Sequence, residues 1–261
     1  MKIVLVGAGN LATNLGKALF DAGNDILQVY SRTMESASVL ATALGGAPVT
    51  AIDCITTDAD VYIVSVKDSV IAEIVPFLCK ERENKIFLHT SGSVSLDVFK
   101  GMALHYGVLY PMQTFSKTKL LSFKNIPCFI EGNDNYTLET SRILAESISE
   151  NVRILSSEAR KHLHLAAVFA CNFVNHCYEI SSEILAKHNI PFDVMLPLID
   201  ETANKVHNME PCKAQTGPAV RYDQNVIRMQ SELLRENPIF KQIYESMSLS
   251  INHVAQKEGE H

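Results

Sequence analysis

Small residues near the N-terminus have the spacing of a phosphate-binding turn. The segment 2–19 reads KIVLVGAGNLATNLGKAL, which places Gly7, Gly9 and Ala12 in a GxGxxA pattern. Gly7 permits a tight turn, Gly9 lets the backbone approach an anion, and Ala12 lets a helix pack closely on a strand. Free N–H groups at the start of that helix can bind a pyrophosphate. The pattern predicts a dinucleotide site at Gly7, Ala8, Gly9, Asn10, Leu11 and Ala12, and the alternative is a structural glycine turn.

The residues that follow the second expected strand indicate which dinucleotide binds. NAD-binding proteins usually carry an acidic residue there, about 20 residues past the glycines, to hold the ribose diol. This chain has Ser31, Arg32 and Thr33 instead. Arginine can pair with a 2′-phosphate and the hydroxyls can donate to it, so the segment favours NADP. The alternative is a solvated turn with an incidental arginine.

Three later strand ends are expected to face the same crevice, because ligands of doubly wound sheets bind outside the carboxyl ends of the strands. The fourth strand leads into VKDS, the fifth into TSGS and the sixth into YPMQTF. From these segments we assign Val66, Lys67, Ser91, Gly92, Pro111 and Gln113 to the cofactor site. Each of these segments can also be read as an ordinary polar connection.

Two polar residues interrupt an apolar run in the second half of the chain. His164 and Asn172 lie in HLHLAAVFACNFVNH, about 12 Å apart along a helix at 1.5 Å per residue. Histidine titrates near neutral pH, so His164 is the candidate general acid or base, and Asn172 is a candidate to orient a substrate. The alternative is a hydrogen-bonded buried histidine. Farther on, Arg221 and Asp223 could contact an anionic substrate, pair with each other or cap the next helix.

These residues need an α/β framework to position them. Strands are expected at 3–6, 25–30, 47–50, 60–66, 85–89, 107–110, 128–130 and 152–155, with helices between several of them. That alternation predicts a doubly wound, mostly parallel Rossmann sheet. After residue 155 only helices are expected, at about 156–188, 192–206, 224–235 and 239–256, with a polar loop at 208–223. The predicted domains are an NADP-binding domain at 1–156 and a helical substrate and dimerisation domain at 157–261.

Composition excludes several classes of protein. The 261 residues are 47% hydrophobic with a net charge of -6, and Lys and Arg are scattered, so we expect no nucleic-acid partner. No apolar stretch approaches the roughly 20 residues that span a bilayer, and the first strand leaves no room for a signal peptide. The six cysteines are dispersed without a CxxC pair, which favours a cytoplasmic protein. His162 and His164 are badly spaced for one ion, and we expect no metal.

The order of the motifs resembles that of a known family. GAGNLA, SRT, VKD, HTSGS, YPMQTFS, HLHLAAVFACNF and TGPAVRYD follow one another over nearly the whole chain. The chain resembles a bacterial family of NADP oxidoreductases with a Rossmann-like N-terminal domain and a C-terminal helical domain of unknown function. The wider group includes 6-phosphogluconate and 3-hydroxyisobutyrate dehydrogenases, pyrroline-5-carboxylate reductase and deazaflavin-dependent NADP reductase. The resemblance implies that the helical domain supplies substrate contacts and a homodimer interface.

One departure from the wider group bears on the reaction. The 3-hydroxy-acid dehydrogenases carry a catalytic lysine shortly before the helix asparagine, and here that position falls near Val168 or Phe169. Lys161 lies too far upstream to replace it. We therefore expect an NADPH-dependent reductase of a small imine or carbonyl compound. The alternative is a non-catalytic NADP-binding sensor that acts through its helical dimer.

Overall fold

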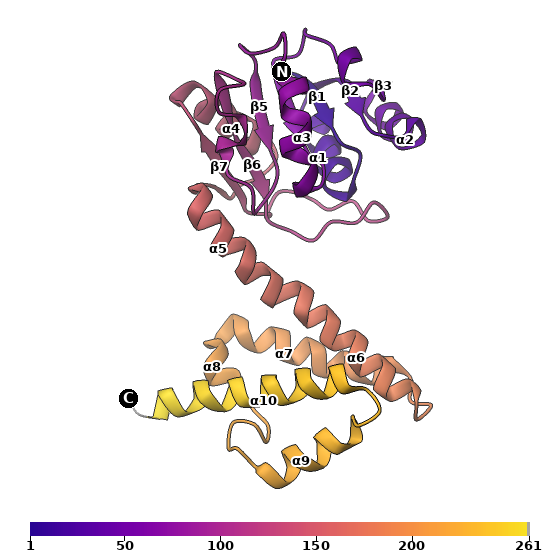
Figure 1. Cartoon of the computed structure of the whole chain (residues 1–261), viewed down its shortest axis with the longest axis vertical. Coiled ribbons are helices and arrows are strands. Elements are labelled where there is room, and N and C mark those ends of the chain that lie inside the picture. Colours follow the sequence, from indigo (N-terminus) through magenta and orange to yellow (C-terminus); the bar gives the residue numbers. More distant parts are fainter. Residues whose placement is uncertain (260–261) are drawn as a thin grey trace. The chain divides into compact units, whose positions relative to one another are not determined.

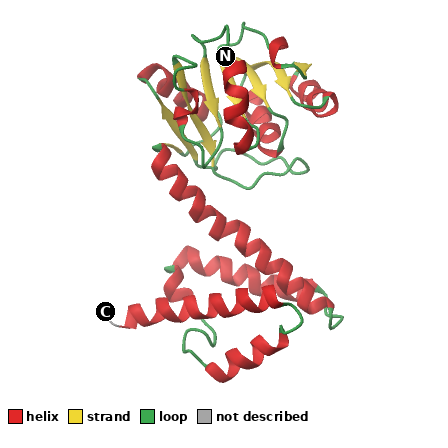
Figure 2. Cartoon of the chain, in the orientation of Figure 1, coloured by secondary structure: helices red, strands yellow, loops and turns green. Residues whose placement is uncertain are grey.

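The chain, described here by a computed structural model of residues 1–259, divides into two compact units (Figure 1). The first unit is Met1–Cys171 and the second begins at Asn172. The first is α/β and the second is helical, so the predicted fold class is confirmed (Figure 2). The first unit extends past residue 156, where we expected the domains to divide, because it includes the helix that follows the last strand.

An eight-stranded sheet forms the centre of the first unit, in the order β3-β2-β1-β4-β5-β6-β7-β8. Its strands are β1 (Lys2–Val6), β2 (Asp25–Tyr30), β3 (Ala47–Val49), β4 (Val61–Val64), β5 (Ile86–His89), β6 (His105–Pro111), β7 (Cys128–Gly132) and β8 (Val152–Ile154). All neighbours are parallel except β6 and β7, which run antiparallel. The chain leaves β1 toward β3 and returns to β4 on the other side of β1, which creates a switch point at their carboxyl ends.

Helices cover both faces of this sheet. They are α1 (Asn10–Asp21), α2 (Met34–Leu44), α3 (Asp68–Cys79), α4 (Asn135–Glu146) and α5 (Ser157–Ala167), with one-turn helices η1 (Ile52–Cys54) and η2 (Leu96–Phe99). Ile3 and Leu5 of β1 pack in a core with α1, α2 and α4, whereas Val4 and Val6 pack in another with α3 and η2. Burial on both faces explains why this strand is apolar at consecutive positions.

The second half of the chain continues as helices. They are the π-helix η3 (Val168–Phe173), α6 (Val174–Ala186), η4 (Phe192–Met195), α7 (Leu196–Asn208), α8 (Pro211–Ala214), α9 (Gln224–Leu233) and α10 (Pro238–Gly259). The expected helix at 156–188 therefore contains a π-helical segment, and the expected loop at 208–223 contains one helical turn. Within the described part of the chain, no helix is long and apolar enough to cross a membrane.

His89, the last residue of β5, is fully buried beside Phe99. Its Nδ1 accepts a hydrogen bond from the Ser91 N–H at 3.2 Å, and burial, helped by the Arg160 charge, lowers its pKa to about 3. An unfolded histidine titrates near pH 6.5. Below that pH the unfolded chain binds a proton that the folded chain does not, so this residue removes stability as pH falls toward 3.

We expect His89 to contribute a loss of about 1.4 kcal/mol of unfolding free energy per pH unit between about pH 6 and 4. Urea unfolding of the wild type and His89→Asn across that range measures the contribution, since asparagine retains an acceptor but cannot titrate. His162→Asn, at a histidine whose side chain is 72% exposed, is the control and should keep the wild-type slope. Equal slopes for wild type and His89→Asn would contradict the assignment.

Candidate cofactor and active site

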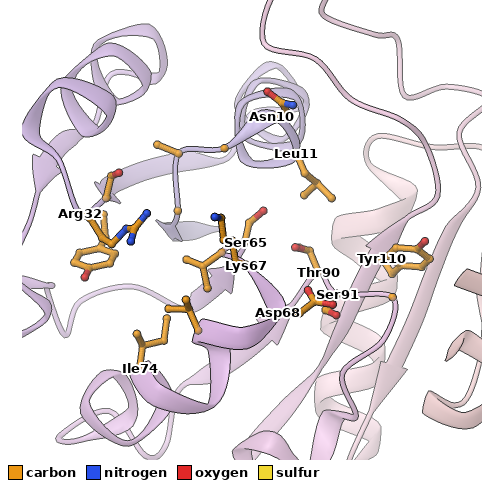
Figure 3. Close-up of a pocket in the computed structure, with 18 of the residues that line it drawn as sticks. Asn10, Leu11, Arg32, Ser65, Lys67, Asp68, Ile74, Thr90, Ser91 and Tyr110 are labelled. Atoms are coloured by element: carbon orange, nitrogen blue, oxygen red, sulfur yellow. The ribbon is translucent and has the colours of Figure 1, made fainter. Parts of the chain in front are cut away.

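A cavity of about 720 Å³ opens in the first unit at the carboxyl ends of β1, β2, β4, β5 and β6 (Figure 3). It lies at the switch point of the sheet, where doubly wound folds bind their ligands. Most of the residues that the sequence assigned to the cofactor line it: Gly7, Ala8, Gly9, Asn10, Leu11, Ser31, Arg32, Val66, Lys67, Ser91, Gly92, Pro111 and Gln113. His164 lines the same cavity.

The glycine turn after β1 has the geometry of an anion cradle. Gly7 has φ +125°, and a Cβ there would overlap the backbone carbonyl of Ser65, so a larger residue does not fit. Gly9 has open space where a Cβ would stand. It is the N-cap residue of α1 and has no side chain that could accept the first N–H groups of the helix. The first N–H groups of α1 therefore remain available to a phosphate group.

Two predicted cofactor residues lie outside the cavity lining. Ala12 is fully buried and packs in the core between α1 and the sheet, which is the packing role that its small size serves. Thr33 caps α2, because its hydroxyl accepts the Ser36 N–H at 3.4 Å. Ser36, one turn into that helix, lines the cavity instead.

The cavity has a cationic end and an aromatic end. Figure 3 shows Arg32 on one side and Tyr110 on the opposite side, with Asp68 and Ser91 nearer to Tyr110. Arg32 is exposed and forms no ion pair with the residues whose contacts are described. Its guanidinium is thus available to a ligand phosphate.

At the other end, His164 is held by two contacts. The Tyr110 hydroxyl lies 3.2 Å from His164 Nδ1, and the two rings meet edge to face with their centroids 6.2 Å apart. The imidazole also lies so close to Gly92 that an added Cβ would stand 2.6 Å from Nδ1. Glycine at 92 therefore makes room for the histidine ring.

Tyr110 is the principal site residue that sequence reasoning did not assign. It is buried near the end of β6, and burial raises its pKa, so its hydroxyl stays protonated at neutral pH. Where that hydroxyl donates to Nδ1, the neutral imidazole carries its own proton on Nε2. A tyrosine within the YPMQTF segment was the only local signal, since its partner lies 54 residues later in the chain.

Two assignments in the second half of the chain have different outcomes. Asn172 is exposed and begins the second unit, so its role opposite the substrate stays a prediction. Asp223 caps α9, since its carboxylate accepts the Val226 N–H at 3.3 Å. Of the alternatives left open for Asp223, capping is the one that the structure shows.

Comparison with known proteins identifies the family. Residues 2–91 match the family model described as NADP oxidoreductase coenzyme F420-dependent, and residues 126–251 match a domain of unknown function, DUF2520. A crystal structure of a "putative NADP oxidoreductase" from Bacteroides fragilis is 50% identical, with a TM-score of 0.92 over 97% of this chain and 98% of that one. The chain belongs to this NADP oxidoreductase family. Its cofactor is NADP.

More distant structures share the fold of this oxidoreductase. An imine reductase from Myxococcus stipitatus in complex with NADP+ is 15% identical, with a TM-score of 0.72 over 98% of this chain and 95% of that one. A 1-pyrroline-5-carboxylate reductase from Streptococcus pyogenes is 14% identical, with a TM-score of 0.63 over 97% and 98% of the two chains. No curated protein sequence matches the oxidoreductase significantly.

We expect Arg32→Ala to weaken NADPH binding by roughly ten- to a hundredfold, because a charge-assisted contact with the 2′-phosphate is lost. NADH lacks that phosphate, so its affinity should stay unchanged. Titration calorimetry with both nucleotides measures the ratio, and Arg153→Ala, at an exposed arginine outside the cavity lining, is the matched control. An unchanged NADPH/NADH ratio in Arg32→Ala would mean that Ser31–Thr33 is only a solvated turn.

Proposed function

We propose that this oxidoreductase reduces the C=N or C=O bond of a small molecule with NADPH, and that His164 delivers the proton. The observation that carries the proposal is the contact of His164 with Tyr110 and Gly92 inside the cavity that the glycine turn also lines. A titratable donor, a hydroxyl that supports it and a nucleotide cradle thus share one volume, as proton-coupled hydride transfer requires.

NADPH held at the glycine turn and Arg32 would supply the hydride for the substrate carbon. The electron pair of the C=N or C=O bond then moves to nitrogen or oxygen, which takes a proton from His164 Nε2. His164 gives this proton as an imidazolium and becomes a neutral imidazole, whose Nδ1–H donates to the Tyr110 hydroxyl oxygen. Ser91 and Gly92 form the surface against which we place the nicotinamide ring, and Asn172 is our candidate to orient the substrate.

The alternative function is a cofactor sensor, and it requires no proton donor. A histidine that contacts a buried tyrosine within the cavity favours an enzyme over a sensor. Imine and carbonyl substrates fit better than a 3-hydroxy acid, because the helix has Val168 and Phe169 where those dehydrogenases carry a lysine. The fold-level likeness to an NADP+-bound imine reductase agrees with this choice.

We also propose that the helical half, from residue 157 onward, forms a homodimer and contributes substrate contacts. Between residues 172 and 257, Ala219 is the one buried hydrophobic side chain. Large apolar residues of this stretch lie exposed, among them Leu198, Leu233, Ile239 and Leu249. Helices without an apolar core need a covering surface, and a second copy of the same unit offers a self-complementary one.

A cytoplasmic location is part of the proposal. Burial raises the pKa of the Cys79 and Cys128 thiols to about 12 and about 11, so both stay protonated and unreactive. Buried reduced thiols suit a reducing compartment.

A screen of cyclic imines and small carbonyl compounds, followed by NADPH absorbance, tests the activity. With a substrate in hand, His164→Ala should lower kcat by about 10²-fold with NADPH affinity nearly unchanged. Tyr110→Phe should cost less, and the double variant should be little worse than His164→Ala, because both side chains serve one proton. The control is His162→Ala, at an exposed histidine on the same helix. Tight NADPH binding without turnover across the panel would favour the sensor.

The dimer is tested by light scattering with mutants of the exposed apolar surface. The wild type should give twice the chain mass of 28.9 kDa at micromolar concentration. Leu198→Glu combined with Leu249→Glu should shift the protein toward monomer, because burying two carboxylates in an apolar interface is costly. Leu104→Glu is the matched control, since Leu104 is similarly exposed on the first unit, at 58%. A wild-type mass of one chain would contradict the dimer.

A further inference from the structure

Arg160, on the first turns of α5, is a fully buried cation that joins three segments of the first unit. Its Nε donates to the Ser91 carbonyl at 3.1 Å, and its Nη2 donates to the Val94 carbonyl at 2.5 Å. Its Nη1 donates to Glu131 Oε2 on β7 at 2.6 Å. The planar guanidinium thus links the loop after β5, strand β7 and helix α5.

A carboxylate balances the buried charge of Arg160. Glu131 is its ion-pair partner, and Glu131 also accepts the Ser157 N–H and the Ser157 hydroxyl, each at 2.7 Å. Ser157 is the first residue of α5, where the helix dipole stabilises a carboxylate. A buried ion pair needs hydrogen bonds of this kind to offset the loss of solvation.

The loop that Arg160 holds forms part of the cavity wall. Ser91 and Gly92 line the cavity, and the Ser91 hydroxyl accepts the N–H groups of Ser93 and Val94, each at 3.1 Å. Arg160 contacts the two carbonyls that flank this turn, at Ser91 and Val94. The loop is therefore fixed from inside the protein by the guanidinium.

The same helix that carries Arg160 also carries His164, four residues later. Residues four apart lie on one face of an α-helix, about 6 Å apart along its axis. Arg160 donates a hydrogen bond to the Ser91 carbonyl, and the His164 ring packs against Gly92, the next residue of the loop. The helix and the loop thus meet at two successive loop residues and at two helix residues that lie about one turn apart.

We propose that Arg160 is a positioning residue, which locks the 91–94 loop to α5 so that Gly92 and His164 present one preformed surface to the nicotinamide ring. The inference rests on the proposed function, which places that ring against Ser91 and Gly92. Arg160 itself does not line the cavity and acts through the loop and the helix. Preorganisation of this kind lowers the cost of ordering the site when the ligand binds.

A comparison of the affinities for two ligands distinguishes this positioning role of Arg160 from a general contribution to folding. NADPH carries the nicotinamide, whereas 2′-phospho-ADP-ribose lacks it and keeps the adenine, both riboses and the phosphates that we place at Arg32 and the glycine turn. Arg160→Gln and Arg160→Lys should weaken NADPH binding about tenfold by calorimetry, with 2′-phospho-ADP-ribose affinity kept within about twofold. Lysine keeps the charge but cannot reach all of the partners, so both variants should behave alike. Hydrogen exchange should show faster exchange of the amides at 91–94 in both variants.

Two further variants calibrate the test. Arg153→Gln, at an exposed arginine outside the cavity lining, should leave both affinities and the exchange rates unchanged. Ser157→Ala removes one partner of Nη2 and one of Glu131, so it should produce a smaller loss in the same direction even if the arginine variants fail to fold.

The outcomes distinguish the inference from the function on which it rests. Equal losses for the two ligands, or none for NADPH, in folded variants would overturn the positioning role alone. If arginine variants do not fold, an unchanged NADPH affinity in Ser157→Ala would overturn it. If the wild type binds NADPH no more tightly than 2′-phospho-ADP-ribose, the proposed nicotinamide site fails, and the inference fails with it.

Discussion

The buried ion pair between Arg160 and Glu131 fixes the position of α5 on the sheet. Strand β7 supplies the carboxylate, and α5 supplies the guanidinium and the N-terminal N–H that share it. Removal of either charge would leave the other buried without a partner, which is costly in a low-dielectric interior. His164 lies one helical turn beyond this anchor, so its place in the cavity depends on it.

The two ends of the cavity differ in charge, and this difference matches the parts of NADPH. Arg32 and the start of α1, which has no side-chain cap, suit phosphate groups because they offer a guanidinium and free N–H groups. The other end carries the buried Tyr110, whose hydroxyl stays protonated at neutral pH because burial raises its pKa. We propose that this difference orients the cofactor, with its phosphates toward Arg32 and its nicotinamide ring toward Tyr110.

Local features of the sequence were enough to predict the sheet and the cationic end of the site. Gly7, Gly9 and Arg32 stand at known distances from a strand end, so short motifs point to them, and all three line the cavity. Tyr110 and Arg160 act through partners 54 and 69 residues away, and no short motif encodes such contacts. Ala12 packs between α1 and the sheet, as its small size in the glycine motif predicts, whereas Thr33, assigned to the cofactor beside Arg32, caps α2. The sequence also gives no signal for the π-helix at Val168–Phe173, because its apolar pattern is that of a continuous α-helix.

The most direct test of this account is a crystal structure of the full chain with NADP+. The account predicts the 2′-phosphate at Arg32, the pyrophosphate at the start of α1, and the nicotinamide ring against Ser91 and Gly92 with His164 beside it. A nicotinamide ring directed into solvent, or a His164 side chain turned away from it, would contradict the central claim that one preformed cavity binds the cofactor and places the proton donor.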